Sequence, residues 1–114
     1  MNEFDLVKKF FEPMCLENPH VLQGIGDDGA VIKWLGSSSL VVATDTLVAG
    51  VHFPHDMEPG AIGYRSGAVN ISDIAAMGAL PKYATLALTI PRADEHWLSQ
   101  FSNGLNEVFS EFGC

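Results

Sequence analysis

Basic residues are scarce in this sequence. Six Lys and Arg stand against fourteen Asp and Glu among 114 residues, so the formal net charge is −8. A nucleic-acid-binding protein usually carries a basic patch, and six dispersed cations cannot easily form one. A polybasic anchor for a membrane surface is disfavoured for the same reason. The charge balance therefore argues against nucleic acids and membrane surfaces as partners.

Cysteine and long apolar runs are also scarce. Cys15 and Cys114 lie far apart and form no CxxC pair, so we expect two free thiols in a reducing compartment. No apolar run approaches the ~20 residues that span a bilayer, and the acidic N-terminus lacks the apolar stretch of a signal peptide. Hydrophobic residues still make up 47% of the chain, which is enough for a packed core. We expect a soluble, cytoplasmic protein.

The hydrophobic pattern predicts a mixture of helices and strands. In chain order we expect a helix over residues 3–12, a loop over 17–29, strands over 30–35 and 40–44, a helix over 60–79, a strand over 82–90 and a last helix that Asp94 caps and Gly113 ends. The first two strands are expected to form a hairpin. This order predicts an α+β fold, with a mixed, mainly antiparallel sheet and helices packed on one face.

The segment Gly24–Gly29 matches the glycine spacing G-x-G-x-x-G of dinucleotide-binding proteins. We reject that interpretation, because the fingerprint must open a helix and a strand-like run follows here. Asp27 and Asp28 would also repel a pyrophosphate. Their carboxylates suit Mg²⁺, which prefers oxygen ligands. The alternative is a solvated Asp-Gly turn.

Two further acidic positions stand out. Asp45 lies with Thr44 at the end of the predicted strand 40–44, where strand ends often face ligands. The alternative is that Asp45 starts a turn. Asp73 lies within the predicted helix 60–79 among apolar neighbours, with Asn70 on the same face. A buried carboxylate there would need a partner such as a metal ion, whereas a solvent-facing Asp73 would not.

Other chemistry has weaker support. His52 follows Gly50-Val51 and is a candidate to bind a phosphate or a substrate ring, although a lone loop histidine is often incidental. The sequence has no HxH or HExxH zinc spacing, no G-x-S-x-G nucleophile elbow and no P-loop. Three acidic positions with few cations instead favour phosphate chemistry that depends on Mg²⁺.

Three segments together closely resemble thiamine-monophosphate kinase. They are Gly24–Asp28, Thr44–Phe53 and Ala68–Ala79, and their order and spacing match over nearly the whole chain. The Gly-Asp-Asp and Asn-x-Ser-Asp motifs also resemble those of selenophosphate synthetase and aminoimidazole ribonucleotide synthetases. The Thr44–Phe53 segment points to the thiamine enzyme in particular.

The resemblance implies an enzyme that transfers the γ-phosphoryl group of ATP directly to thiamine monophosphate, giving thiamine diphosphate. By motif, the ligands of several Mg²⁺ ions would be Asp28, Thr44, Asp45 and Asp73. His52 would contact thiamine phosphate, and Asp27 would be an additional metal or phosphate position. No protein nucleophile is expected, because the acceptor phosphate is already anionic. The resemblance also implies a homodimer that joins the N-terminal-domain sheets, with an aminoimidazole ribonucleotide synthetase-like fold.

The resemblance has two departures. Ala43 occupies a position where many relatives have Ser, which removes one expected metal contact. The family also continues beyond residue 114 with a strand, a Gly-Gly-Asp-Thr motif and a C-terminal domain. We therefore expect residues 1–114 to hold an incomplete N-terminal metal, ATP-phosphate and dimerisation domain that lacks kinase activity alone. The alternatives are another ATP-dependent enzyme of the superfamily, such as one like selenophosphate synthetase, and a non-catalytic metal-binding or dimerisation module.

Overall fold

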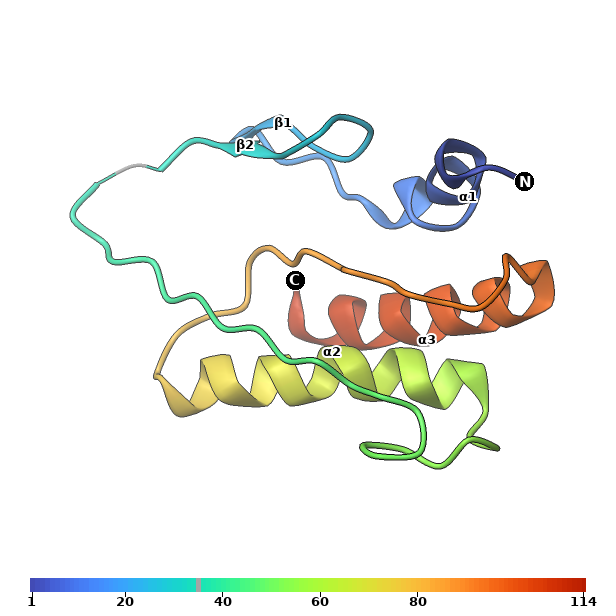
Figure 1. Cartoon of the computed structure of the whole chain (residues 1–114). Coiled ribbons are helices and arrows are strands. Elements are labelled where there is room, and N and C mark those ends of the chain that lie inside the picture. The colour runs from blue at the N-terminus through green and yellow to red at the C-terminus, as the bar shows by residue number, and fades with distance from the viewer. Residues whose placement is uncertain (35) are drawn as a thin grey trace. The chain divides into compact units, whose positions relative to one another are not determined.

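The computed structural model describes residues 1–34 and 36–114, and it divides into two compact units (Figure 1). The first unit, Met1–Leu40, contains two short helices and a small sheet. The second unit, Val41–Cys114, contains two long helices and the segments that lead to and join them.

The first unit begins with a short helix, α1, over Glu3–Phe10. The Oδ1 atom of Asn2 accepts a hydrogen bond of 2.9 Å from the N–H of Asp5 and caps the helix. A 3-10 turn, η1, follows over Glu12–Met14, because Pro13 has no N–H with which to continue the α-helix. The helix predicted over 3–12 is confirmed in type and place, with its last residue in η1.

The sheet of the described chain has two antiparallel strands, β1 over Val21–Gln23 and β2 over Val31–Ile32. Val21 pairs with Ile32 and Gln23 pairs with Val31, and the register is irregular between these two pairs. The prediction of a loop over 17–29 is wrong at β1. A three-residue strand is too short to show an alternating pattern, and only its partner defines it. The predicted strand 30–35 is present only as β2, and its last residue lies outside the described residues.

The predicted hairpin between residues 30–35 and 40–44 is also wrong. In the described chain β2 pairs with β1, and residues 40–44 form no strand. The pattern of residues 40–44 favours an extended backbone, and Figure 1 draws residues 41–48 as a plain tube. An apolar run can specify extension, but it does not specify the chain with which it pairs.

The second unit is built on α2 over Pro59–Ala76 and α3 over Glu95–Phe112, which lie side by side and run in the same direction (Figure 1). Both helices were predicted from apolar spacing, and both are confirmed. The apolar side chains buried between and around them are Ile62, Ile71, Leu98, Phe101, Leu105 and Val108. Leu98 and Val108 are fully buried.

Glycines allow the two helices to approach closely. A Cβ atom at Gly104 would overlap the carbonyl oxygen of Gly60, and one at Gly63 would overlap that of Phe101.

A side-chain hydrogen bond also joins the two helices. On the outside of the pair, the hydroxyl group of Tyr64 donates a 2.8 Å hydrogen bond to a carboxylate oxygen of Glu111. This bond is the main reason that the pKa of Tyr64 lies above its ordinary value. Close backbone packing and this side-chain bond therefore add to the buried apolar contacts between α2 and α3.

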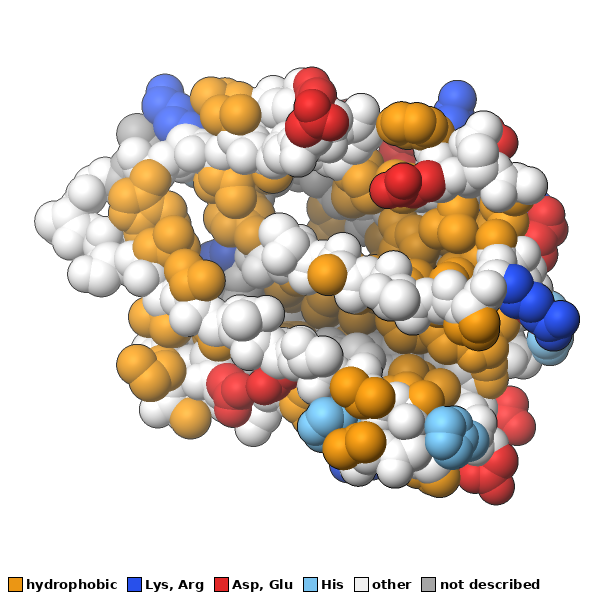
Figure 2. Space-filling view, in the orientation of Figure 1, with side chains coloured by type: hydrophobic (Ala, Val, Ile, Leu, Met, Phe, Trp, Pro, Cys, Tyr) orange, Lys and Arg blue, Asp and Glu red, His pale blue; other side chains and the backbone are white. Residues whose placement is uncertain are grey.

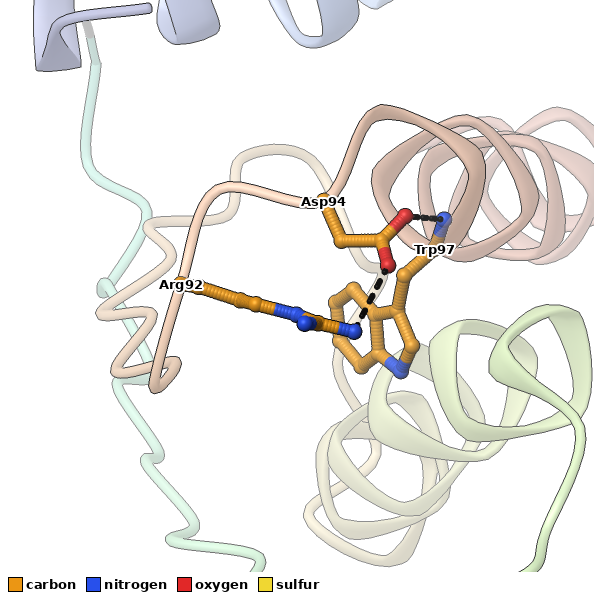
Figure 3. Close-up of polar contacts among 3 residues, drawn as sticks. All are labelled: Arg92, Asp94 and Trp97. Atoms are coloured by element: carbon orange, nitrogen blue, oxygen red, sulfur yellow. Dashed lines mark hydrogen bonds and ion pairs between the residues drawn. The ribbon is translucent and has the colours of Figure 1, made fainter.

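Asp94 caps α3, as predicted (Figure 3). Its Oδ1 atom accepts a 3.1 Å hydrogen bond from the N–H of Trp97, and its Oδ2 atom lies 3.6 Å from a guanidinium nitrogen of Arg92. The Trp97 hydrogen bond is the largest cause of the lowered pKa of Asp94. The Trp97 ring stacks on that of Phe101, with 4.9 Å between ring centroids. At the other end Gly113, with φ of 71°, terminates α3 as expected.

The predicted strand 82–90 is wrong as a strand, because it has no ladder partner in the described chain. Figure 1 draws it as a plain tube that returns from the end of α2 toward the start of α3. Two parallel 18-residue helices require such a return, since each is about 27 Å long. Nine extended residues span about 30 Å, which is enough. Residues 41–48 and 82–90 are called the extended segments below.

The remaining sequence expectations concern cysteine and apolar length. Cys15 and Cys114 are free thiols, as expected. Burial raises the pKa of both thiols, and the Glu12 carboxylate adds to the rise at Cys15. Among the helices of the described residues, none combines the length and apolar character needed to cross a bilayer.

Candidate functional site

The Gly-Asp-Asp motif lies in the turn that joins β1 to β2. Gly26 has φ of 108°, in a region that glycine adopts freely, and this lets the turn bend. The Oδ1 atom of Asp27 accepts a 2.8 Å hydrogen bond from the N–H of Asp28, and both side chains are exposed. A strand and not a helix follows Gly29, as the argument against a dinucleotide fingerprint requires. The turn leaves both carboxylates accessible to solutes.

Thr44 and Asp45 lie in the extended segment 41–48 of the second unit. Both side chains are exposed, and so is that of Ala43 beside them. The segment leads into a tight loop that begins at Val48. Asp45 can therefore reach a solvent-borne ligand without any rearrangement of the α2 and α3 core.

His52 belongs to a loop, Val48–Phe53, that is closed by its own hydrogen bonds. The carbonyl oxygen of Val48 accepts from the N–H groups of Val51 and His52, at 3.0 and 2.9 Å. The N–H of Gly50 donates to the carbonyl oxygen of Phe53 at 2.7 Å. The N–H of Val48 donates to Nδ1 of His52 at 2.8 Å, while the imidazole stays exposed. The loop thus fixes the direction of one ring nitrogen.

Asp73 lies in the last turn of α2 and is exposed. Of the two alternatives that the sequence left open for its side chain, the structure has the solvent-facing one. Asn70, which is half-buried, donates from Nδ2 to the carbonyl oxygen of Ser66 at 2.9 Å and is thereby held along the helix. An exposed carboxylate needs no buried partner, so the packing of α2 does not demand a metal ion.

The acidic candidates are divided between the two units of the chain. Asp27 and Asp28 belong to the first unit, whereas Asp45 and Asp73 belong to the second. In residues 1–34 and 36–114, no three His, Cys, Asp or Glu side chains lie close enough together to hold a metal ion. Mg²⁺ commonly takes only one or two carboxylates and completes its shell with water and substrate phosphates. Exposed carboxylates fit that mode of binding, and the ligand roles stay predictions.

Two shallow hollows lie on the second unit. They share Gly60 and Glu107 on the α2 and α3 pair, and neither is lined by Asp45, His52 or Asp73. The candidate residues are exposed and line neither of these two hollows.

Sequence reasoning missed the groups that hold His52. These are the N–H of Val48 and the glycine at position 50, whose φ is 78°. A Cβ atom at Gly50 would overlap the imidazole of His55. A backbone donor leaves no signal in the residue types, although the Ala-Gly-Val run before His52 does indicate a turn.

Comparison with known proteins identifies the family. Residues 26–114 match the family described as AIR synthase related protein, N-terminal domain. The chain is 44% identical to the thiamine-monophosphate kinase of Escherichia coli K12, over 96% of this chain and 34% of that protein. It is 41% identical to the enzyme of the same name from Buchnera aphidicola subsp. Schizaphis graminum, over 97% of this chain and 34% of that protein.

A solved structure gives the same likeness in three dimensions. The crystal structure of thiamine-monophosphate kinase from Stenotrophomonas maltophilia K279a matches with a TM-score of 0.83 and 41% identity, over 98% of this chain and 35% of that one. The chain spans about a third of the length of the curated relatives it matches. The predicted α+β class and the resemblance to thiamine-monophosphate kinase are confirmed. The chain belongs to the family of AIR synthase related proteins, through their N-terminal domain.

Proposed function

We propose that the protein containing this chain phosphorylates thiamine monophosphate with ATP, giving thiamine diphosphate. The observation that carries this proposal is the combined likeness to a solved thiamine-monophosphate kinase, with 41% identity and a TM-score of 0.83 across 98% of the chain. Sequence identity and backbone likeness cover the same residues, including all the motifs named above.

The chain supplies binding groups in this proposal and no nucleophile. The acceptor is a phosphate oxygen that already carries negative charge, so no side chain has to activate it. What the protein must do is bring two anionic groups together in line. The exposed imidazole of His52 is assigned to the phosphate of thiamine monophosphate. Asp28, Thr44, Asp45 and Asp73 are assigned to metal-bound phosphates, with Asp27 as an additional position.

A divalent cation is needed because this chain cannot neutralise the phosphates itself. It has six Lys and Arg against fourteen Asp and Glu. When bound, Mg²⁺ ions supply the positive charge that offsets the phosphoryl oxygens. Asp28, Asp45 and Asp73 are all exposed, so each can contribute a carboxylate to a metal that a nucleotide already carries.

A second copy of the chain is the proposed partner of the extended segments. Backbone N–H and C=O groups of an extended chain need partners, and an exposed edge favours pairing with another copy. Apolar side chains are exposed on and beside these segments: Val42 (80%), Leu80 (76%), Val48 (46%) and Leu86 (45%). Figure 2 shows hydrophobic side chains at many places on the visible surface. A homodimer would cover part of this surface.

The activity is tested with the full-length protein, ATP, Mg²⁺ and thiamine monophosphate. We expect thiamine diphosphate to form, and we expect the 114-residue chain alone to form little or none. Selenide and an aminoimidazole ribonucleotide precursor serve as alternative acceptors in parallel. Turnover of either of these in place of thiamine monophosphate would contradict the proposed substrate. Robust turnover by the 114-residue chain would contradict the expectation that this chain alone is inactive.

The metal assignment is tested by Asp45→Asn and Asp73→Asn in the full-length protein. Each change removes one carboxylate charge at an exposed position, so we expect a higher Mg²⁺ concentration for half-maximal rate without loss of folding. Asp56→Asn is the matched control, because Asp56 is also exposed but lies in none of the motifs. Unchanged Mg²⁺ dependence in both variants would remove Asp45 and Asp73 from the metal site.

A further inference from the structure

The loop Val48–Phe53 orients His52 by a bond from the backbone. The N–H of Val48 lies 2.8 Å from Nδ1 of His52, and an N–H group can only donate. Nδ1 must therefore accept, with its lone pair directed at Val48. In a neutral imidazole one nitrogen accepts and the other carries the proton. The proton of the neutral His52 ring is thus on Nε2.

The backbone of the loop is held independently of the imidazole. Three further hydrogen bonds connect Val48, Gly50, Val51, His52 and Phe53, at 2.7 to 3.0 Å. They restrain the backbone on the C-terminal side of Val48, whose N–H is the donor to the ring. An imidazole bound in this way is pre-organised, which reduces the entropy that a ligand must offset when it binds.

The backbone conformation at position 50 favours glycine. Its φ of 78° lies in the left-handed region that side chains rarely adopt. A Cβ atom would also overlap Nε2 of His55, but this is the outer end of an exposed side chain that can rotate away. Gly36 shares this backbone conformation, with φ of 83°, but lies outside the loop Val48–Phe53 and has no atom within 4 Å of an added Cβ. The two glycines therefore form a matched pair.

We propose that Val48, through its N–H, and Gly50 are positioning residues that hold His52 as the Nε2–H tautomer, ready to donate a hydrogen bond to a phosphate oxygen. The ligand class is a phosphate monoester. The inference rests on the proposed function, which assigns His52 to the phosphate of thiamine monophosphate.

The positioning is tested by nitrogen-15 NMR of the full-length protein, labelled at histidine and valine, at about pH 8.5, where an ordinary imidazole is neutral. We expect a scalar coupling between the Val48 amide nitrogen and Nδ1 of His52, and ring shifts that place the proton on Nε2. The coupling should disappear in Gly50→Ala and persist in Gly36→Ala. A spectrum without this coupling, or with the proton on Nδ1, would overturn the inference.

The role in binding is tested in the full-length enzyme with His52→Asn and His52→Gln. Asparagine keeps an acceptor near the Nδ1 position and loses the outer donor, whereas glutamine keeps an outer donor and loses the anchored acceptor. We expect His52→Asn to raise KM for thiamine monophosphate about tenfold or more, with a smaller change in kcat. Gly50→Ala should raise KM and Gly36→Ala should not.

The outcomes separate this inference from the proposed function. An unchanged KM in both His52→Asn and Gly50→Ala would overturn the inference while leaving the kinase assignment intact. A full-length protein that does not phosphorylate thiamine monophosphate would overturn the proposed function. In that case the NMR coupling still decides whether the loop holds the tautomer, and a titration with inorganic phosphate shows whether Nε2–H of His52 responds to phosphate.

Discussion

The α2 and α3 pair and the extended segments belong to one unit but are stabilised in different ways. The helices form their backbone hydrogen bonds within themselves and bury six apolar side chains. The extended segments have no ladder partner in the described residues and expose Val42 and Leu86. The difference shows that a helix can be complete within a short chain, whereas a strand depends on a second segment for its hydrogen bonds.

The largest expected effect is in the core of the helix pair. Leu98 is fully buried, so Leu98→Ala should lower the free energy of unfolding by about 3 kcal/mol through lost burial and a cavity. Urea unfolding followed by circular dichroism measures this loss. Leu86→Ala, at a side chain 45% exposed, is the control in an extended segment and should cost less than about 1 kcal/mol. Equal losses in the two variants would contradict the comparison.

A second effect concerns the close approach of the helices. In Gly104→Ala the new methyl group would overlap the backbone of Gly60, and we expect a net loss of about 2 kcal/mol despite the better helix propensity of alanine. Gly29→Ala is the control, because nothing lies within 4 Å of its added Cβ. Thermal unfolding of both variants measures this loss. If Gly104→Ala were as stable as the parent, the close approach of the two helices would not contribute to the stability.

A smaller effect is expected from the cap of α3. The pKa of Asp94 is lowered, mainly by the hydrogen bond from Trp97, so its folded state binds a proton less readily than its unfolded state. The stabilisation is complete above the ordinary Asp value near 3.8 and is lost as the pH falls through the lowered value. Asp94→Asn keeps a capping oxygen but does not titrate. The free energy of unfolding of Asp94→Asn should therefore depend less on pH in that acid range than that of the parent. If the two pH profiles were identical, the Asp94 cap would not be the cause of the acid destabilisation.

The smallest effect on the free energy of unfolding is expected in the extended segments. The same substitutions are expected to weaken dimer formation. Val42→Ser and Leu86→Ser replace exposed side chains, so unfolding should change by no more than about 0.5 kcal/mol. If the segments pair with a second copy, the same changes in the full-length protein should shift sedimentation toward the monomer. A dimer that withstands both changes would mean that these segments do not form the interface.

The sequence predicted the helices better than the strands, for a physical reason. Periodic apolar residues, the Asp94 cap and the Gly113 terminator act within a few residues of where they stand, and all are in the structure. The short strand at Val21–Gln23 and the partner of β2 are defined by pairing with another segment and not by local periodicity, so the pattern missed the first and misassigned the second.

The candidate site divides in the same way. The motifs identified Asp28, Asp45, His52 and Asp73 by residue type, and the structure describes each of them as exposed. The backbone N–H that orients His52 belongs to no particular residue type, so only the folded structure reveals it. Residue types therefore point to a chemistry, whereas the direction of a donor depends on the fold of its loop.

The shared direction of α2 and α3 has an electrostatic consequence. Peptide dipoles add along a helix and leave partial negative charge at its C-terminal end. Because the two helices are parallel, those negative ends lie at the same end of the pair (Figure 1). Neither helix has a basic residue in its last turn, and α2 carries Asp73 there. A cation that reaches Asp73 would therefore be attracted by the aligned peptide groups as well as by the carboxylate.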